Sequence, residues 1–128
     1  MKAIWRFPER GALAALLILL CLYIAPHVSF AHAYPEHADP KVGSMVAVAP
    51  SVVRIWFDSA LEPLFSTISV KNQSGEIVDK GDGRVDASDP TLLEASVPPL
   101  PSGTYRVIWD VVARDGHRTT GNFSFTIK

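Results

Sequence analysis

Apolar and polar residues alternate along most of the chain beyond residue 50, which is the pattern of strands that bury one face. In the clearest example, Val53, Ile55 and Phe57 fall on one side of an extended segment, with polar or larger residues between them. The alternation predicts strands over residues 51–58, 65–71, 76–78, 91–97, 104–111 and 122–128.

Turn-forming segments separate these predicted strands. Residues 98–103 include three prolines and a glycine, so they cannot belong to a central strand and form a connector. No segment beyond residue 31 has a convincing helical period, because Pro63 interrupts the one candidate, residues 59–65. Short strands separated by turns in about 100 residues predict an all-β, immunoglobulin-like Greek-key sandwich or barrel.

Three aromatic residues have expected places in such a fold. Tyr105 follows a Pro-Ser-Gly connector, as a tyrosine-corner residue does. Trp56 and Trp109 are both expected in the hydrophobic core.

The first 31 residues resemble a secretory signal peptide. Basic residues precede an uncharged, Leu- and Ala-rich run over residues 11–25, which Pro26 ends. Two cleavage points fit the small-x-small rule: after Ala31, leaving His32 first, or after Ala33, leaving Tyr34 first. An uncleaved membrane anchor is the alternative, although a spanning helix needs about 20 apolar residues. We expect residues 1–31 to be removed and residues 32–128 to form the mature domain, without membrane insertion.

Composition narrows the possible functions. The net charge is −1, and no cluster of Lys and Arg indicates a nucleic-acid partner. Cys21 is the only cysteine and lies within the apolar run, so the processed protein would contain no disulfide or thiolate site. Met45 would be its only methionine, so the sequence alone does not supply the several thioether ligands of a Cu(I) site.

The segment Asp115-Gly116-His117 carries the first candidate ligands. Gly116 allows a tight bend, and residues two positions apart lie on the same side of an extended segment. A carboxylate and an imidazole so placed could bind a metal ion, although Asp-Gly is also a common, purely structural turn dipeptide.

His32 could complete the set if cleavage follows Ala31. Its ring and its free α-amine would then chelate together, and an α-amine has an ordinary pKa of about 7.7–8.0, so a metal can displace its proton. With the His117 ring and an Asp115 oxygen, the ligand set would contain three nitrogens and one oxygen. Such a set suits Cu(II) best and Ni(II) next, and zinc also accepts these ligands. His37 is a further candidate, with a solvated loop histidine as the alternative. A disordered terminus is expected to contribute little packing.

The chain contains, in this order, His32-Ala33, residues 38–44, 53–57 and 100–107, Asp115-Gly116-His117 and residues 121–125. Together these segments resemble the CopC family of periplasmic copper-binding, or copper resistance, proteins. The resemblance implies an immunoglobulin-like fold and one Cu(II) per chain, bound by the amine and ring of His32 with Asp115 and His117. We expect a non-enzymatic monomer that serves copper resistance or homeostasis in the periplasm. A CopD-type inner-membrane protein is the implied partner, and the Met-rich Cu(I) loop of some members is absent.

Two alternatives remain from the sequence. An N-terminal histidine with a second histidine also forms the copper site of lytic polysaccharide monooxygenases, but those enzymes need an open metal position that Asp115 would fill. The other alternative is a metal-free, immunoglobulin-like structural module.

Overall fold

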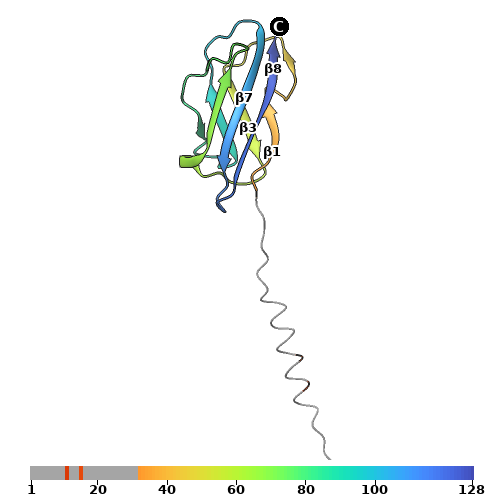
Figure 1. Ribbon diagram of the computed structural model, residues 1–128, viewed down its shortest axis with the longest axis vertical. Helices are drawn as coiled ribbons and strands as arrows, with labels where there is room; N and C mark the ends of the chain where they lie inside the picture. The colour runs from red at the N-terminus through yellow and green to blue at the C-terminus, as the bar shows by residue number, and fades with distance from the viewer. Residues whose placement is uncertain (1–10, 12–14, 16–31) are drawn as a thin grey trace, which may run out of the picture. The chain divides into compact units, whose positions relative to one another are not determined.

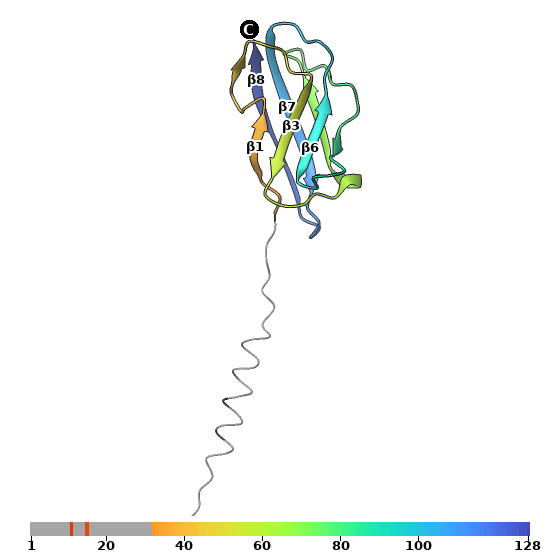
Figure 2. The same ribbon diagram turned by 180° about the vertical axis from the view of Figure 1, so that it is seen from behind.

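Two four-stranded β-sheets form a sandwich in the structure, a computed structural model that describes Gly11, Ala15 and residues 32–128 (Figures 1 and 2). One sheet contains, in spatial order, β1 (Pro35–Asp39), β3 (Val52–Phe57), β6 (Leu92–Ser96) and β5 (Arg84–Val85). The other contains β2 (Met45–Val46), β8 (Arg118–Ile127), β7 (Gly103–Val112) and β4 (Thr67–Lys71). The predicted all-β sandwich is therefore confirmed.

The chain divides into two units, Met1–Phe30 and Ala31–Lys128, and the sandwich belongs to the second. The expected signal peptide lies outside the described residues, apart from Gly11 and Ala15. Over the described part of the chain, no helix has the length and apolar character needed to cross a membrane.

The core fills the space between the sheets because each long strand presents alternate residues inward. Val53, Ile55 and Phe57 of β3 are at most 2% exposed, as their predicted shared face requires. Phe125 of β8 is 1% exposed and packs in the same core cluster. Burying a side chain of this size contributes about 1.5–3 kcal/mol to folding, so this alternation is the main determinant of the sandwich.

The predicted strands agree with β3, β4, β6, β7 and β8, with differences at their ends. β8 begins at Arg118, four residues before the predicted start, because it pairs with β7 over its whole length. The predicted strand over residues 76–78 is wrong, since this segment forms only the isolated bridge between Lys71 and Ile77. The short strands β1, β2 and β5 were not predicted, and residues Pro63–Phe65 form a 3₁₀ turn.

The aromatic predictions are confirmed for Tyr105 and Trp109 and wrong for Trp56. The Tyr105 hydroxyl donates a 2.7 Å hydrogen bond to the Pro101 carbonyl, which closes the tyrosine corner. Trp109 is 8% exposed and meets Phe57 edge-on. Trp56 instead lies on the outer face of its sheet, because it alternates with the buried residues of β3, and there it stacks on His37.

Gly121→Ala is expected to destabilise the domain by about 1–3 kcal/mol. A Cβ at Gly121 would overlap Cζ2 of the buried Trp109 ring, which cannot move without disturbing the core. Chemical denaturation of this variant tests the expectation, with Asn122→Ala, at the next and exposed position, as the control. An unchanged midpoint for Gly121→Ala would show that the indole is not fixed as described.

Candidate metal centre

The hairpin between β7 and β8 presents the first two candidate ligands at the end of the sandwich where β1 begins (Figure 1). The turn is closed by hydrogen bonds from Ala113 N to His117 O (2.9 Å) and from Gly116 N to Ala113 O (2.8 Å). Gly116 has φ +92°, a conformation that L-residues with a side chain rarely adopt. The glycine therefore allows the bend on which the placement of Asp115 and His117 depends.

Asp115 and His117 contact each other directly within this turn. The backbone N–H of His117 donates to Asp115 Oδ1 at 3.0 Å, and His117 Nδ1 lies 3.0 Å from Asp115 Oδ2. The first of these contacts is the main reason that the pKa of Asp115 is lowered, with smaller contributions from the His117 and His32 side chains. The carboxyl group is thus ionised at neutral pH and orients the imidazole beside it.

His32 joins this pair across a long separation in sequence. The centroids of the His32 and His117 rings are 4.6 Å apart, with the ring planes inclined by 59°. The Tyr34 ring lies beyond His32, at a centroid distance of 5.9 Å. The structure therefore brings together all three residues predicted as the main ligands, at one end of the sandwich.

The segment that carries His32 is fixed to the domain by at least four hydrogen bonds, one of them from Asp58 N to the Tyr34 carbonyl at 2.9 Å. The Thr119 hydroxyl donates a 2.7 Å hydrogen bond to the Ala33 carbonyl. The Tyr34 N–H donates to Asp58 Oδ1 at 2.8 Å, and the Ser59 hydroxyl donates to the His32 carbonyl at 3.2 Å. The expectation of a disordered terminus is therefore wrong from His32 onward. Ala33 is fully buried, which explains why this segment packs.

His37 has a different environment from the other two histidines. Its ring stacks on Trp56 at a centroid distance of 4.4 Å and an interplanar angle of 13°, on the outer face of β1 and β3. The stacking accounts for the position of this ring, so the structure gives His37 a packing role.

Within residues 32–128, no group of three or more His, Cys, Asp or Glu side chains is already arranged to hold a metal ion. His32, Asp115 and His117 are neighbours, and a closed ligand set would need a rearrangement of these side chains or a further donor. In the full-length chain the nitrogen of His32 is an amide, because Ala31 precedes it. Cleavage between these residues would supply the further donor as a primary amine.

Sequence reasoning did not identify Thr119, Asp58 and Ser59 as supports of the site. Thr119 lies two residues after His117, and residues two positions apart in an extended segment lie on the same side. This spacing was the only local indication that Thr119 is close to the site. Nothing in the sequence linked it to Ala33, 86 positions away.

Comparison with known proteins identifies relatives along almost the whole described segment. The CopC domain family matches residues 35–128. The copper transport protein CutJ of Bacillus subtilis is 33% identical over 88% of this chain, although the chain spans only 21% of its length. The crystal structure of CopC from Methylosinus trichosporium OB3b covers 76% of this chain and 94% of its own, with 32% identity and a TM-score of 0.68.

The crystal structure of PcoC, a methionine-rich copper resistance protein from Escherichia coli, resembles this chain about as closely as the first structure does. It is 32% identical, covers 77% of this chain and all of its own, and has a TM-score of 0.65. The family match covers the sandwich, including Asp115 and His117, and begins three residues after His32. The chain belongs to the CopC family.

Proposed function

We propose that this protein binds copper in copper resistance or transport and holds one Cu(II) at His32, Asp115 and His117. The proposal rests on one observation: the centroids of the His32 and His117 rings are 4.6 Å apart, and the ionised Asp115 lies beside them. Two imidazoles and a carboxylate provide borderline and hard donors, which Cu(II) prefers to thioethers. The relatives named for copper support the choice of metal over nickel or zinc.

Asp115 can serve this site in either of two ways. In the present arrangement Nδ1 of His117 faces Oδ2, which would leave Nε2 to bind the metal, and a carboxylate that orients a histidine raises its basicity. Direct ligation of Cu(II) by Asp115, the role that we propose, requires this contact to open, because a metal bound at Nε2 would lie on the opposite side of the ring from the carboxylate.

We infer that processing occurs between Ala31 and His32. Cleavage after Ala33 would remove a fully buried residue and the carbonyl that accepts the Thr119 hydrogen bond. Cleavage after Ala31 preserves both contacts and creates the α-amine of His32. Residues 1–31 then act as the signal peptide, and residues 32–128 are the copper-binding domain in the periplasm.

The ligand chemistry supports a Cu(II) carrier without a matching Cu(I) site. Met45 is the only methionine after residue 31 and is 63% exposed on β2. A soft Cu(I) site needs several sulfur donors. We further propose that the protein is a non-enzymatic monomer that exchanges Cu(II), with a CopD-type inner-membrane protein as the partner.

Two measurements test the proposal: the mass of the exported protein, which identifies its first residue, and the spectrum of the bound copper. Intact mass measurement of the exported protein should give a chain that starts at His32. Electron paramagnetic resonance of this protein with one equivalent of Cu(II) should show a tetragonal centre with nitrogen hyperfine structure. A spectrum with oxygen ligands alone, or a chain starting at Tyr34, contradicts the proposed site.

Thr119→Val is expected to weaken Cu(II) binding by about tenfold, as outer contacts of metal sites commonly do. Valine has nearly the shape of threonine but cannot hold the Ala33 carbonyl, so His32 loses its fixed position beside His117. A chelator competition titration measures the change. Thr119→Ser, which keeps the hydroxyl, should retain native affinity, and Thr120→Val, at the adjacent exposed position, is the control. Equal affinity for Thr119→Val and native protein would show that this hydrogen bond does not position His32.

A further inference from the structure

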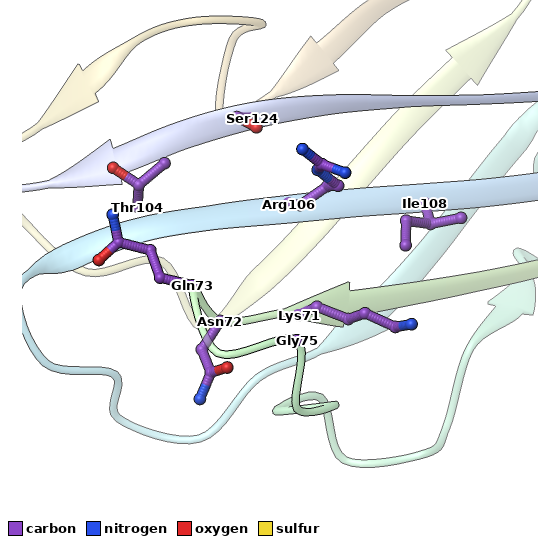
Figure 3. Close-up of a pocket in the computed structure, with 8 residues that line it drawn as sticks. All are labelled: Lys71, Asn72, Gln73, Gly75, Thr104, Arg106, Ile108 and Ser124. Carbon is purple, nitrogen blue, oxygen red and sulfur yellow. The ribbon is translucent and has the colours of Figure 1, made fainter.

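A groove of about 480 Å³ crosses the outer face of the sheet β2-β8-β7-β4, away from the candidate metal centre (Figure 3). β4, the turn that follows it, β7 and β8 line the groove. The lining residues are Lys71, Asn72, Gln73, Gly75, Thr104, Arg106, Ile108 and Ser124. The groove lies toward the start of β7, whereas Asp115 and His117 follow the end of β7.

Two cations in this groove occupy directly opposite positions on neighbouring strands. Lys71 of β4 pairs in register with Arg106 of β7. Like charges directly opposite each other destabilise an antiparallel pair. In Figure 3 the two charged groups point in different directions from their strands, which lessens the repulsion without neutralising either charge.

The other basic residues of the strands have carboxylate partners. Arg54 and Arg84 both pair with Glu94, at 3.1 and 2.7 Å, and Arg118 pairs with Asp110 at 3.1 Å. Among the ion pairs of residues 32–128, neither Lys71 nor Arg106 has a partner within 4.0 Å.

The surrounding side chains do not supply the missing negative charge. The acid in the adjacent turn, Glu76, keeps its charge but, within residues 32–128, makes no ion pair with either cation; it accepts a 2.7 Å hydrogen bond from the neutral Asn72 side chain. Thr104 and Ser124 add hydroxyl groups that can donate to an oxygen ligand. The groove thus combines two uncompensated cations with neutral donors.

We propose that this groove binds a small oxyanion, either a carboxylate or a phosphate, at the Arg106 guanidinium, with Lys71 as the second cation of the groove. A guanidinium binds both groups with paired hydrogen bonds, and an ammonium adds a point charge. The volume falls within the range of small-molecule sites, about 300–1,000 Å³. This site is independent of copper and of the proposed metal ligands.

The experiment titrates the metal-free, ¹⁵N-labelled protein separately with inorganic phosphate and with succinate, at constant ionic strength. We expect saturable shifts of the Lys71 and Arg106 amide signals with a Kd on the order of 1 mM. The anion with the lower Kd identifies the class of oxyanion. Shifts that increase without saturation for both anions would overturn the proposal.

Arg106→Gln should weaken this binding at least about tenfold, since it removes the paired donors. The same change should raise the thermal midpoint at low salt, because the repulsion with Lys71 is lost. This second measurement also confirms that the variant is folded. Lys41→Gln removes the same charge from an exposed loop and should leave both properties unchanged. Equal binding by native protein and Arg106→Gln would overturn the proposal.

Discussion

Protein that begins at His32 is expected to bind Cu(II) at least about 10–100-fold more tightly than protein with one extra residue before it. The extension turns the α-amine into an amide, which is a far poorer ligand, and the chelate ring of His32 is lost. Loss of contacts outside the ligand shell alone costs about 10–100-fold, so loss of a direct donor should cost at least as much. The rings of His32 and His117 and the Asp115 carboxylate remain, so weaker binding should persist.

A competition titration against a chelator of known affinity measures this difference. The matched control adds the same residue after Lys128, at the opposite end of the sandwich, where neither the charge nor the position of the ligands changes (Figure 1). Thermal midpoints should agree among all three proteins, because the contacts of Ala33 and Tyr34 are retained. Equal copper affinities would show that the amine of His32 is not a ligand.

His117→Ala is expected to reduce Cu(II) affinity by at least about 100-fold, which exceeds the usual effect of a residue outside the ligand shell. The imidazole is the only nitrogen donor on the hairpin between β7 and β8, and its side chain is 47% exposed. Removing it costs little packing, so the domain should remain folded. The electron paramagnetic resonance spectrum of the Cu(II)-loaded variant should show one nitrogen hyperfine coupling fewer than that of native protein.

Two further variants make this test specific. Asp115→Asn keeps a hydrogen-bond acceptor for the His117 N–H but removes the charge, so its affinity should fall between those of native protein and His117→Ala. Arg114→Ala changes an exposed residue of the same turn whose described hydrogen bond, to the Ala60 carbonyl, is made by the backbone. Native affinity in His117→Ala would show that the histidine is not a ligand, and unfolding of that variant would show that it serves the fold.

The long strands could be predicted from sequence because each buries one face over its length. β3 alternates between partly and fully buried residues from Val52 to Phe57, which is the signal that hydrophobic periodicity detects. β1 escaped detection because Ala38 is its only buried residue, so its sequence has no alternation. β2 and β5 contain two residues each, which is too short for any periodic signal.

The sequence also predicted which three residues lie together at this end of the sandwich, since their chemistry is visible in the residue types themselves. The residues that hold these ligands in place could not be predicted, because their role depends on contacts between segments far apart in the sequence. The hydrogen bond from Thr119 to Ala33 and the burial of Ala33 follow from the sandwich as a whole. Trp56 shows the same limit: its size suggested the core, while the register of β3 directs it outward to His37.

The outermost strands of the two sheets also bear on how the protein behaves in crowded solution. β1 and β5 end one sheet, and β2 and β4 end the other; none is longer than five residues. Three of these four strands carry a residue that disfavours strand addition: Pro35 on β1, Lys71 on β4 and Arg84 on β5. Few unpaired backbone groups are left to recruit a strand from another chain, so the sandwich is protected against aggregation through its edges.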